Sequence, residues 1–230
     1  MNATLGMKVA PSTVWEILTQ EGIDPSPDRM SLTWADFLRS QADALLAGDF
    51  IETITLNGQR QYILAVIEHA SRRIRVLGTT AHPTAAWVTQ AIRNLVMDLE
   101  EAGCRARFLI HDRDGKFPAP TEELLADVGI QTVLTGIRMP RMNAVMERWV
   151  QSCRRELLDQ CLLRNERPLR RALREYAEFS NRHRAHQALD QAAPLRAVPD
   201  PITDPAGIAD LKVRRRDRLG GVPHEYSHAA

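Results

Sequence analysis

The sequence predicts an α/β fold in which a mixed sheet is flanked by helices, and three observations predict it. Strand-forming stretches at 50–56 and 61–67 are joined through Asn57-Gly58, a strong short-range signal of a β-hairpin. Short apolar runs then alternate with stretches of helical period. The resulting element order is βββ-α-β-α-β-α, which favours one sheet with helices packed against it.

The first half of this order continues beyond the hairpin. A third strand is predicted over 73–77. A helix is predicted over 84–101 because apolar side chains recur there at helical spacing, and Gly103 marks its end. A short buried strand over 107–111 follows.

The second half contains two more helical regions around one strand. A helix over 122–127 is closed by Gly129, and a strand is predicted over 131–134. A long helix is predicted over 143–163, with apolar residues along one side, and a second helical stretch covers about 169–182.

The chain divides by composition into three parts. Residues 1–32 form a small helical unit that ends in a linker, because Pro and Asp cluster at 24–28. Residues 33–193 form the α/β core with its C-terminal helices. Residues 194–230 hold a Pro-rich segment and an irregular basic tail.

Composition describes an ordinary globular protein with an uneven charge distribution. Of 230 residues, 44% are apolar and 26% are charged, which excludes a disordered or collagen-like chain. The net charge of +1 by itself predicts neither nucleic-acid nor membrane binding. Residues 138–184, however, hold twelve Arg against six acids, so the later half carries a basic face.

Cysteine usage and hydropathy favour a cytoplasmic protein. The three cysteines lack the spacing of a zinc finger and cannot all be paired within one chain, so neither a structural zinc nor a disulfide framework is predicted. No apolar run reaches the roughly 18 residues of a membrane span.

Three acidic residues fall where a catalytic site would form. Asp49 lies at the start of the first predicted strand, Asp112 just past the fourth, and Glu147 in the first turns of the long helix. In an open α/β sheet, strand ends and adjacent helix starts converge on one crevice. Carboxylates gathered there bind divalent cations, which neutralise the attacking and leaving oxygens in phosphoryl transfer.

Three stretches carry a family resemblance: HDRDGKF at 111–117, PRMNAVMERW at 140–149 and NRHRAHQAL at 181–189. Asp112 and Glu147 also lie 35 positions apart, the spacing in the acidic signature of polynucleotidyl transferases with a ribonuclease-H-like core. The sequence therefore resembles the DDE-type integrase and transposase family, in particular the integrase core of bacterial insertion-sequence transposases.

This resemblance implies a ribonuclease-H-like fold and Mg-dependent cleavage and strand transfer of DNA. It assigns Asp49, Asp112 and Glu147 as both catalytic residues and metal ligands, with two Mg²⁺ or Mn²⁺ ions expected when DNA is bound. It implies that identical subunits assemble on DNA at the nucleoid. It also implies that 1–32 are an amino-terminally truncated helix-turn-helix. The zinc-binding His/Cys module of retroviral integrases has no counterpart, so no zinc is expected.

The basic residues of the later half are the candidates for DNA contact. If about six of them contact phosphates, the logarithm of affinity falls with the logarithm of salt concentration by about 0.9 per contact. A solvated surface is the alternative for any single residue. The predicted DNA-contacting residues are Arg138, Arg141, Asn143, Arg148, Arg154, Arg155, Arg182 and Arg184.

Several alternatives stay open from the sequence. Asp114 competes with Asp112, although the family's D-x(4)-F spacing runs from Asp112 to Phe117. Glu147 could be a first-turn acid that complements the helix dipole. The whole protein could be a catalytically inactive DNA-binding remnant that regulates a full-length transposase, or a metal-dependent nuclease of the same fold that nicks without joining.

Overall fold

The computed structural model describes residues 33–113, 115–136, 143–198 and 212–228, together with the single positions 13, 16, 20 and 21. Its contacts divide the chain into two compact units, 1–40 and 41–230. The small helical unit predicted over 1–32 lies largely outside the described residues.

In the first unit, the short helix α2 (Trp34–Ser40) begins with a reciprocal cap. The backbone N–H of Asp36 donates to Thr33 Oγ1 at 3.2 Å, and the backbone N–H of Thr33 donates to Asp36 Oδ2 at 3.3 Å. These bonds satisfy groups that the first turn of a helix otherwise leaves unpaired.

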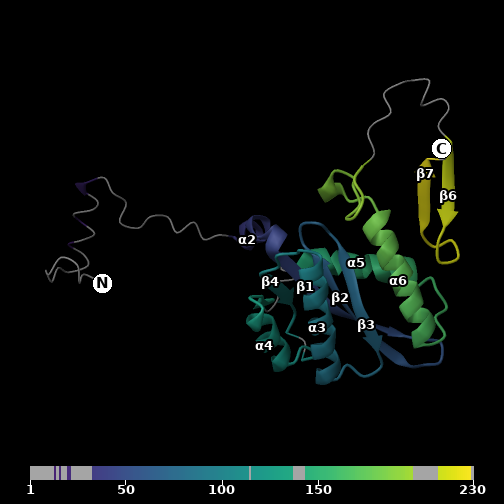
Figure 1. Ribbon diagram of the computed structural model, residues 1–230, viewed down its shortest axis with the longest axis horizontal. Coiled ribbons are helices and arrows are strands. Elements are labelled where there is room, and N and C mark those ends of the chain that lie inside the picture. The colour runs from purple at the N-terminus through teal and green to yellow at the C-terminus, as the bar shows by residue number, and fades with distance from the viewer. Residues whose placement is uncertain are drawn as a thin grey trace. The chain divides into compact units, whose positions relative to one another are not determined.

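The second unit contains a five-stranded mixed sheet, which confirms the predicted fold class (Figure 1). Its strand order is β3-β2-β1-β4-β5. The first three strands pair antiparallel, whereas β1 with β4 and β4 with β5 pair parallel. The bounds are β1 (Leu45–Ile54), β2 (Arg60–Glu68), β3 (Ile74–Thr80), β4 (Phe108–His111) and β5 (Gln131–Leu134).

β1 begins earlier than the sequence predicts. Residues 45–48 are all buried and therefore show no alternation of apolar and polar side chains. They belong to the strand because β2 pairs with them on one side and β4 on the other. Asp49 consequently lies in the middle of β1 and not at its start.

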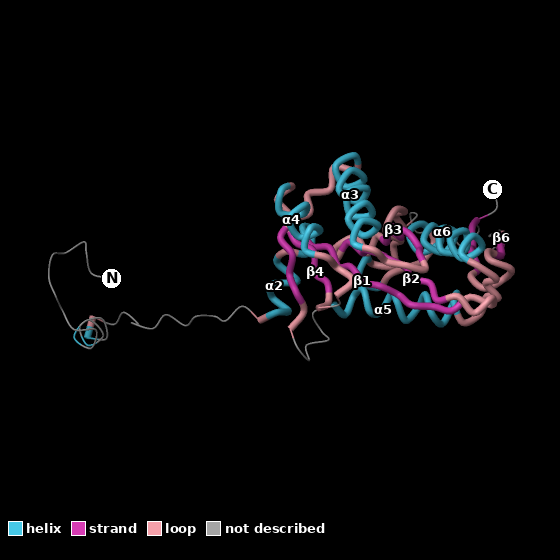
Figure 2. The backbone as a smooth tube through the Cα atoms, turned by 90° about the horizontal axis from the view of Figure 1, so that it is seen from below, coloured by secondary structure: helices cyan, strands magenta, loops and turns pink. Residues whose placement is uncertain are grey.

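Helices cover both faces of the sheet. Figure 2 shows α3 (Ala85–Glu101) and α4 (Ala119–Asp127) on one face and α5 (Ala144–Cys153) on the other. The core under α3 is apolar and includes Ile92 and Leu95, neither of which is exposed. Burial of such side chains is the main favourable contribution to folding.

Local signals set several element ends as predicted. Thr84 caps α3 by accepting the Trp87 N–H at 3.3 Å. Gly58, Gly103 and Gly129 have positive φ, a conformation that glycine adopts without steric cost. The predicted long helix ends sooner than expected, because α5 passes at Arg154 into one π-helical segment, η3 (Arg154–Leu158).

A polar cluster joins η3 to α6 (Glu166–Arg182). Tyr176 donates its hydroxyl to Glu156 Oε2 at 2.9 Å. The guanidinium of Arg184 donates to both carboxylate oxygens of Glu156 and lies 5.7 Å from the ring centroids of Tyr176 and Phe179. Such a two-pronged ion pair, stacked on aromatic rings, fixes the chain that leaves α6 against η3.

The C-terminal tail that the sequence predicts to be irregular instead contains a hairpin, β6 (Val213–Asp217) and β7 (His224–His228). The hairpin contacts α6. The Leu219 N–H donates to Glu175 Oε1 at 3.3 Å, and Glu225 Oε2 lies 2.6 Å from Arg218 Nε and 3.6 Å from His183 Nε2. Among the described helices, none is long and apolar enough to cross a membrane.

α6 also pairs with the outer edge of the sheet through one side chain. Asn181 accepts the Ile74 N–H at 2.8 Å through Oδ1 and donates to the Ile74 carbonyl at 2.9 Å through Nδ2. Both residues are buried. The amide therefore pairs both backbone groups of the first residue of β3, at an edge of the sheet where they would otherwise have no strand partner.

We predict that Asn181→Ala lowers the free energy of unfolding by about 1–3 kcal/mol, because it leaves two buried backbone groups without partners. Chemical denaturation measures the change. The exposed Asn94 on α3 provides the matched control, and Asn94→Ala should leave stability nearly unchanged. A loss for Asn181→Ala no larger than that of the control would contradict this role.

Candidate active site and basic surface

Strand pairing brings two of the three predicted catalytic acids to equivalent positions. The parallel pairing of β1 with β4 matches Leu45 with Phe108 and continues to Ala47 with Ile110. Two residues further along each chain come Asp49 and Asp112. The observed pairs end at Ala47 with Ile110. Continued by two residues past them, with strands about 4.8 Å apart, this register sets Asp49 opposite Asp112, which directly follows the last residue of β4.

The two aspartates also share a face of the sheet. Leu46 and Phe50 of β1, and Leu109 of β4, lie in the core beneath α3. Because side chains alternate along a strand, Asp49 and Asp112 point to the opposite face, the one that α5 covers. Both are partly buried. Asp49 Oδ1 accepts the N–H of the next residue, Phe50, at 2.7 Å.

An aromatic cluster fixes the loop that carries Asp112. Phe117 returns to the core, where its ring lies 4.1 Å from that of His111 and 5.2 Å from that of Phe50. His111 Nδ1 lies 2.6 Å from the carbonyl oxygen of Asp112, and burial lowers the pKa of this histidine. The loop is therefore held at both ends, next to the end of β4. This arrangement gives a physical reason for the D-x(4)-F spacing.

Glu147 approaches from α5, in its first turn. Val145 and Trp149 line a pocket on the flank of α5 that faces the chain after α6. A step of two residues turns an α-helix by about 200°, so Glu147 points away from that pocket. The pocket is bordered by the end of β2 and by the turn that leads to β3, so it lies on the β3 side of the sheet. β4 lies on the other side of β2 and β1 in the strand order. The opposite flank of α5, which carries Glu147, therefore faces the β4 side, where Asp112 lies.

The structure thus brings Asp49 and Asp112 together and places Glu147 on the flank that faces them. In the described part of the chain, no group of three His, Cys, Asp or Glu residues is close enough to hold a metal ion. Asp114, the alternative to Asp112, lies outside the described residues. The carboxylate oxygens of the aspartate pair are the ligands that Mg²⁺ and Mn²⁺ prefer, so the pair fits a divalent cation and Glu147 would have to join it.

The predicted DNA-contacting residues fall into several environments. Arg148, Arg154, Arg155 and Arg182 are exposed. Arg184 is held by Glu156 in the cluster described above. Two others, Arg138 and Arg141, lie outside the described residues.

Asn143 has a different position from these arginines. It is the N-cap residue of α5 and is 5% exposed. Its Oδ1 has no hydrogen-bond partner among the described residues. The side chain is therefore enclosed at the start of the helix and does not form part of the surface.

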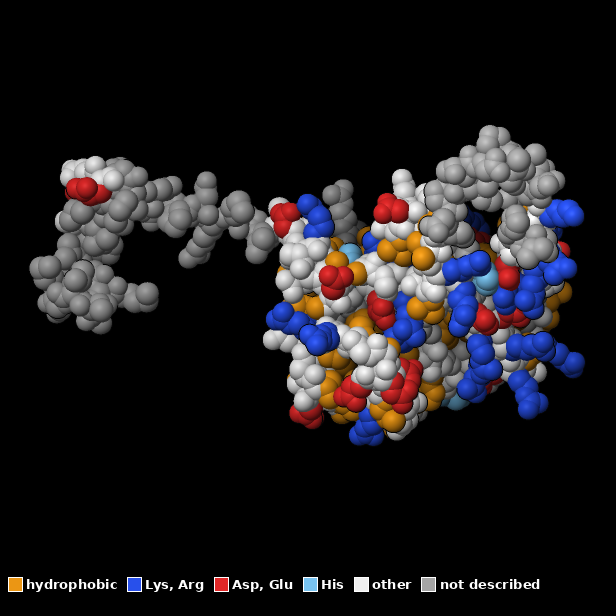
Figure 3. Space-filling view, turned by 45° about the horizontal axis from the view of Figure 1, so that its top comes forward, with side chains coloured by type: hydrophobic (Ala, Val, Ile, Leu, Met, Phe, Trp, Pro, Cys, Tyr) orange, Lys and Arg blue, Asp and Glu red, His pale blue; other side chains and the backbone are white. Residues whose placement is uncertain are grey.

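A row of arginines on α6 is absent from the set predicted from the sequence to contact DNA. Arg167, Arg170, Arg171 and Arg174 are all exposed. Their spacing of three and four residues places them on one face of the helix, and this spacing is the signal that could have identified them. Figure 3 shows that Lys and Arg gather toward the side of the molecule that carries α6 and the C-terminal hairpin.

A family model described as integrase core domain matches residues 128–194. The matched segment contains β5, α5 and α6, and therefore Glu147, but neither aspartate of the pair. A search of curated proteins finds no match.

Similar solved structures are viral integrases. The catalytic core domain of BIV integrase is 18% identical, with 66% of this chain and 91% of that chain covered and a TM-score of 0.49. A chain from the simian T-cell lymphotropic virus intasome, solved with the PP2A regulatory subunit B56 gamma, is 13% identical, with 82% and 67% covered and a TM-score of 0.51. The HTLV-2 integrase catalytic core domain in complex with magnesium is 14% identical, with 61% and 87% covered and a TM-score of 0.44.

The intasome chain shares the ribonuclease-H-like arrangement of sheet and helices described above. The family match covers residues 128–194, and the likeness to the intasome chain extends to the fold of the sheet and its helices.

Proposed function

We propose that this protein is a divalent-metal-dependent polynucleotidyl transferase that cleaves DNA strands and joins them to a target. The observation that supports the proposal is the parallel register of β1 and β4, because its continuation by two residues brings Asp49 and Asp112 opposite each other on the face covered by α5. The integrase core match over 128–194 supports Glu147 as the third acid.

Each acid has a distinct structural origin in this site. Asp49 comes from the middle of a buried central strand, Asp112 from a loop held by Phe117, and Glu147 from the first turn of α5. Mg²⁺ or Mn²⁺ ions held by these carboxylates, two when DNA is bound, would supply charge neutralisation at the attacking and leaving oxygens. The carboxylates would also be relieved of their mutual repulsion.

DNA would be held largely through its phosphates. The exposed arginines of α5, η3 and the end of α6 can contact phosphate oxygens without sequence preference. We further propose that identical subunits assemble on DNA. Arg184 contributes to the fold through Glu156, so we place it outside the DNA-contacting set.

One observation favours a second candidate function. Within the described residues the three acids do not form a cluster that could hold a metal. A protein that retains the basic surface but not the assembled site would bind DNA without turnover, as a regulatory remnant of a transposase. The two candidates differ in whether purified protein with Mg²⁺ or Mn²⁺ joins DNA strands.

We predict that Asp49→Asn, Asp112→Asn and Glu147→Gln each reduce strand transfer by at least about 100-fold, the scale on which loss of one electrostatic stabiliser lowers kcat. A gel-based joining assay with labelled oligonucleotides measures the rate. The exposed acids of α4 supply matched controls, and Asp127→Asn and Glu123→Gln should retain wild-type rates. Full joining by any of the three site variants would remove that residue from the site. DNA binding without turnover by wild-type protein would select the regulatory candidate.

Cation binding should be visible without any DNA. At a Mg²⁺ or Mn²⁺ concentration about ten times the dissociation constant, binding to the native state should raise the Tm by about 3–6 °C. The double variant Asp49→Asn/Asp112→Asn should lose this shift, because the remaining Glu147 is a single ligand. Differential scanning calorimetry with and without EDTA provides the measurement. An equal shift in the double variant would show that the ions bind elsewhere.

The salt dependence of DNA binding tests the arginine assignments. Arg154→Gln and Arg182→Gln should each reduce the slope of log affinity against log salt by about 0.9, because each removes one phosphate contact. Arg184→Gln should instead lower the Tm, because it removes the two-pronged partner of Glu156 and leaves that partly buried carboxylate with only the exposed Arg155 as a cation. Fluorescence anisotropy at several salt concentrations measures the slopes. Unchanged slopes for Arg154→Gln and Arg182→Gln would mark these arginines as a solvated surface.

A further inference from the structure

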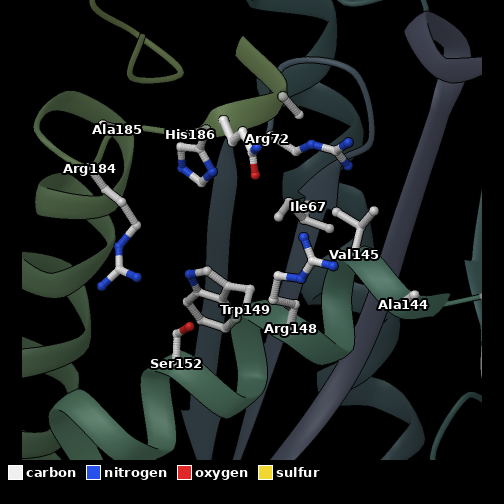
Figure 4. A pocket seen from close by; sticks show the side chains of 12 residues that line it. Ile67, Arg72, Ala144, Val145, Arg148, Trp149, Ser152, Arg184, Ala185 and His186 are labelled. Atoms are coloured by element: carbon white, nitrogen blue, oxygen red, sulfur yellow. The ribbon is translucent and has the colours of Figure 1, made fainter. Parts of the chain in front are cut away.

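The flank of α5 that faces away from Glu147 borders a cavity of about 550 Å³. Its walls come from the end of β2 and the following turn, from α5, and from the chain after α6. Figure 4 shows the rings of Trp149 and His186 on opposite sides of the hollow, with Arg184 to one side. A volume of this size lies within the range of small-molecule sites.

The cavity is strongly basic. Arg72, Arg148, Arg184 and His186 line it, and no acid occurs among the described residues of its wall. Arg184 is paired with Glu156, which lies outside the wall. Burial, and then the neighbouring charge of Arg148, lower the pKa of Arg72, so the two guanidinium groups of the wall repel each other. An anion between them would relieve this repulsion.

Hydrogen-bond donors are enclosed here without partners. Arg72 Nη1, Arg184 Nε, His186 Nε2 and Trp149 Nε1 are buried nitrogens that have no hydrogen-bond partner in the described part of the chain. Buried polar atoms are nearly always hydrogen-bonded in folded proteins, so a cluster of four in the wall of one cavity requires an explanation. A ligand rich in acceptor oxygens supplies that explanation.

The backbone at Arg72 gives independent support. Its φ is 62°, the left-handed conformation that side chains other than Gly, Asn and Asp rarely adopt. The turn between β2 and β3 would be less strained with asparagine or glycine at this position. Strain of this kind is retained where surrounding structure or function requires a particular side chain, and here the side chain present is a cation in the cavity wall.

We propose that this cavity is a phosphate-binding site, in which Arg72, Arg148 and His186 bind the oxygens of a phosphate group. The guanidinium fork matches the geometry of phosphate oxygens, and a neutral histidine can donate through Nε2. Burial and the nearby arginines lower the pKa of His186, which is consistent with a neutral ring before a ligand binds. The cavity exceeds the size of a phosphate ion, and its apolar wall of Ile67 and Val145 leaves room for an attached sugar or base.

This site is separate from the proposed catalytic acids. Because Glu147 points away from the cavity, binding here needs neither the carboxylates nor a metal ion. The proposal therefore stands independently of the proposed strand-transfer activity. A negative result for the phosphate site would leave the proposed strand-transfer activity untouched, because phosphate binding is measured in EDTA and without turnover.

Isothermal titration calorimetry of the full chain in EDTA tests the proposal with three probes: inorganic phosphate, the mononucleotide dAMP and a short single-stranded oligonucleotide. At least one probe should bind saturably with one site per chain, and Asp49→Asn/Asp112→Asn should bind it equally well. Arg72→Asn should weaken binding about tenfold or more, since it removes a charged hydrogen-bond donor. Its Tm should not fall, because asparagine is favoured among non-glycine residues at positive φ.

Two further variants keep the outcome interpretable. Arg148 is exposed on α5, so the Arg148→Gln variant should weaken binding without unfolding the protein. Arg93 is exposed on α3, away from the cavity, and the Arg93→Gln variant should bind the probe as the wild type does. Equal affinity for phosphate and dAMP would indicate that the phosphate group alone is recognised. Tighter, Arg72-dependent oligonucleotide binding would identify a DNA phosphate as the source. Absence of binding by all three probes, or wild-type affinity in both Arg72→Asn and Arg148→Gln, would overturn the proposal.

Discussion

The parallel pairing of β1 with β4 is the constraint on which the rest of this structure depends. It joins an antiparallel hairpin to a parallel half-sheet at the centre of the fold, and it fixes which residues of the two strands are neighbours. A shift of one residue would send Asp49 and Asp112 to opposite faces, because side chains alternate with a period of two. The buried apolar residues on both strands oppose such a shift. The same packing that stabilises the core therefore sets the geometry of the acids.

α5 is the element that relates the acids to the rest of the surface. Its buried residues, including Met146 and Cys153, attach it to the sheet. One flank then carries Glu147 toward the β4 side, and the other lines the basic cavity with Val145 and Trp149. One helix would thus contribute to a site for divalent cations on its acidic flank and to a site for phosphate on its basic flank. The polar cluster around Glu156 holds the next segment in place, so neither flank is formed by α5 alone.

The order of elements could be predicted from the sequence because each signal is local. The Asn57-Gly58 turn and the helix ends at Gly103 and Gly129 depend on a few neighbouring residues. The first residues of β1 could not be predicted, since a strand buried on both faces lacks alternation. The hairpin of β6 and β7 could not be predicted either, because β6 is exposed along its whole length and is dominated by arginine.

The candidate site was predictable in kind but not in detail. The types and spacing of the acids pointed to them, whereas their relation in space depends on sheet order and on which flank of α5 is buried. Their catalytic roles stay a prediction. The basic cavity gave no signal in the sequence, because Arg72, Arg148 and His186 come from segments that are distant along the chain. A single arginine in a turn becomes notable when its positive φ and its unpaired nitrogen are known.

The most direct measurement of the central claim is a disulfide cross-link between Asp49→Cys and Asp112→Cys in one chain, mapped by mass spectrometry after mild oxidation. Neighbouring paired strands hold their Cα atoms within the range that a disulfide spans. The account predicts a 49–112 disulfide that is distinct from any involving the free cysteines Cys104, Cys153 and Cys161. The comparison pair Glu52→Cys and Asp112→Cys should give none, because position 52 lies on the other face and about 10 Å further along the strand. A 52–112 bond in place of a 49–112 bond would contradict the register, and with it the proposed site.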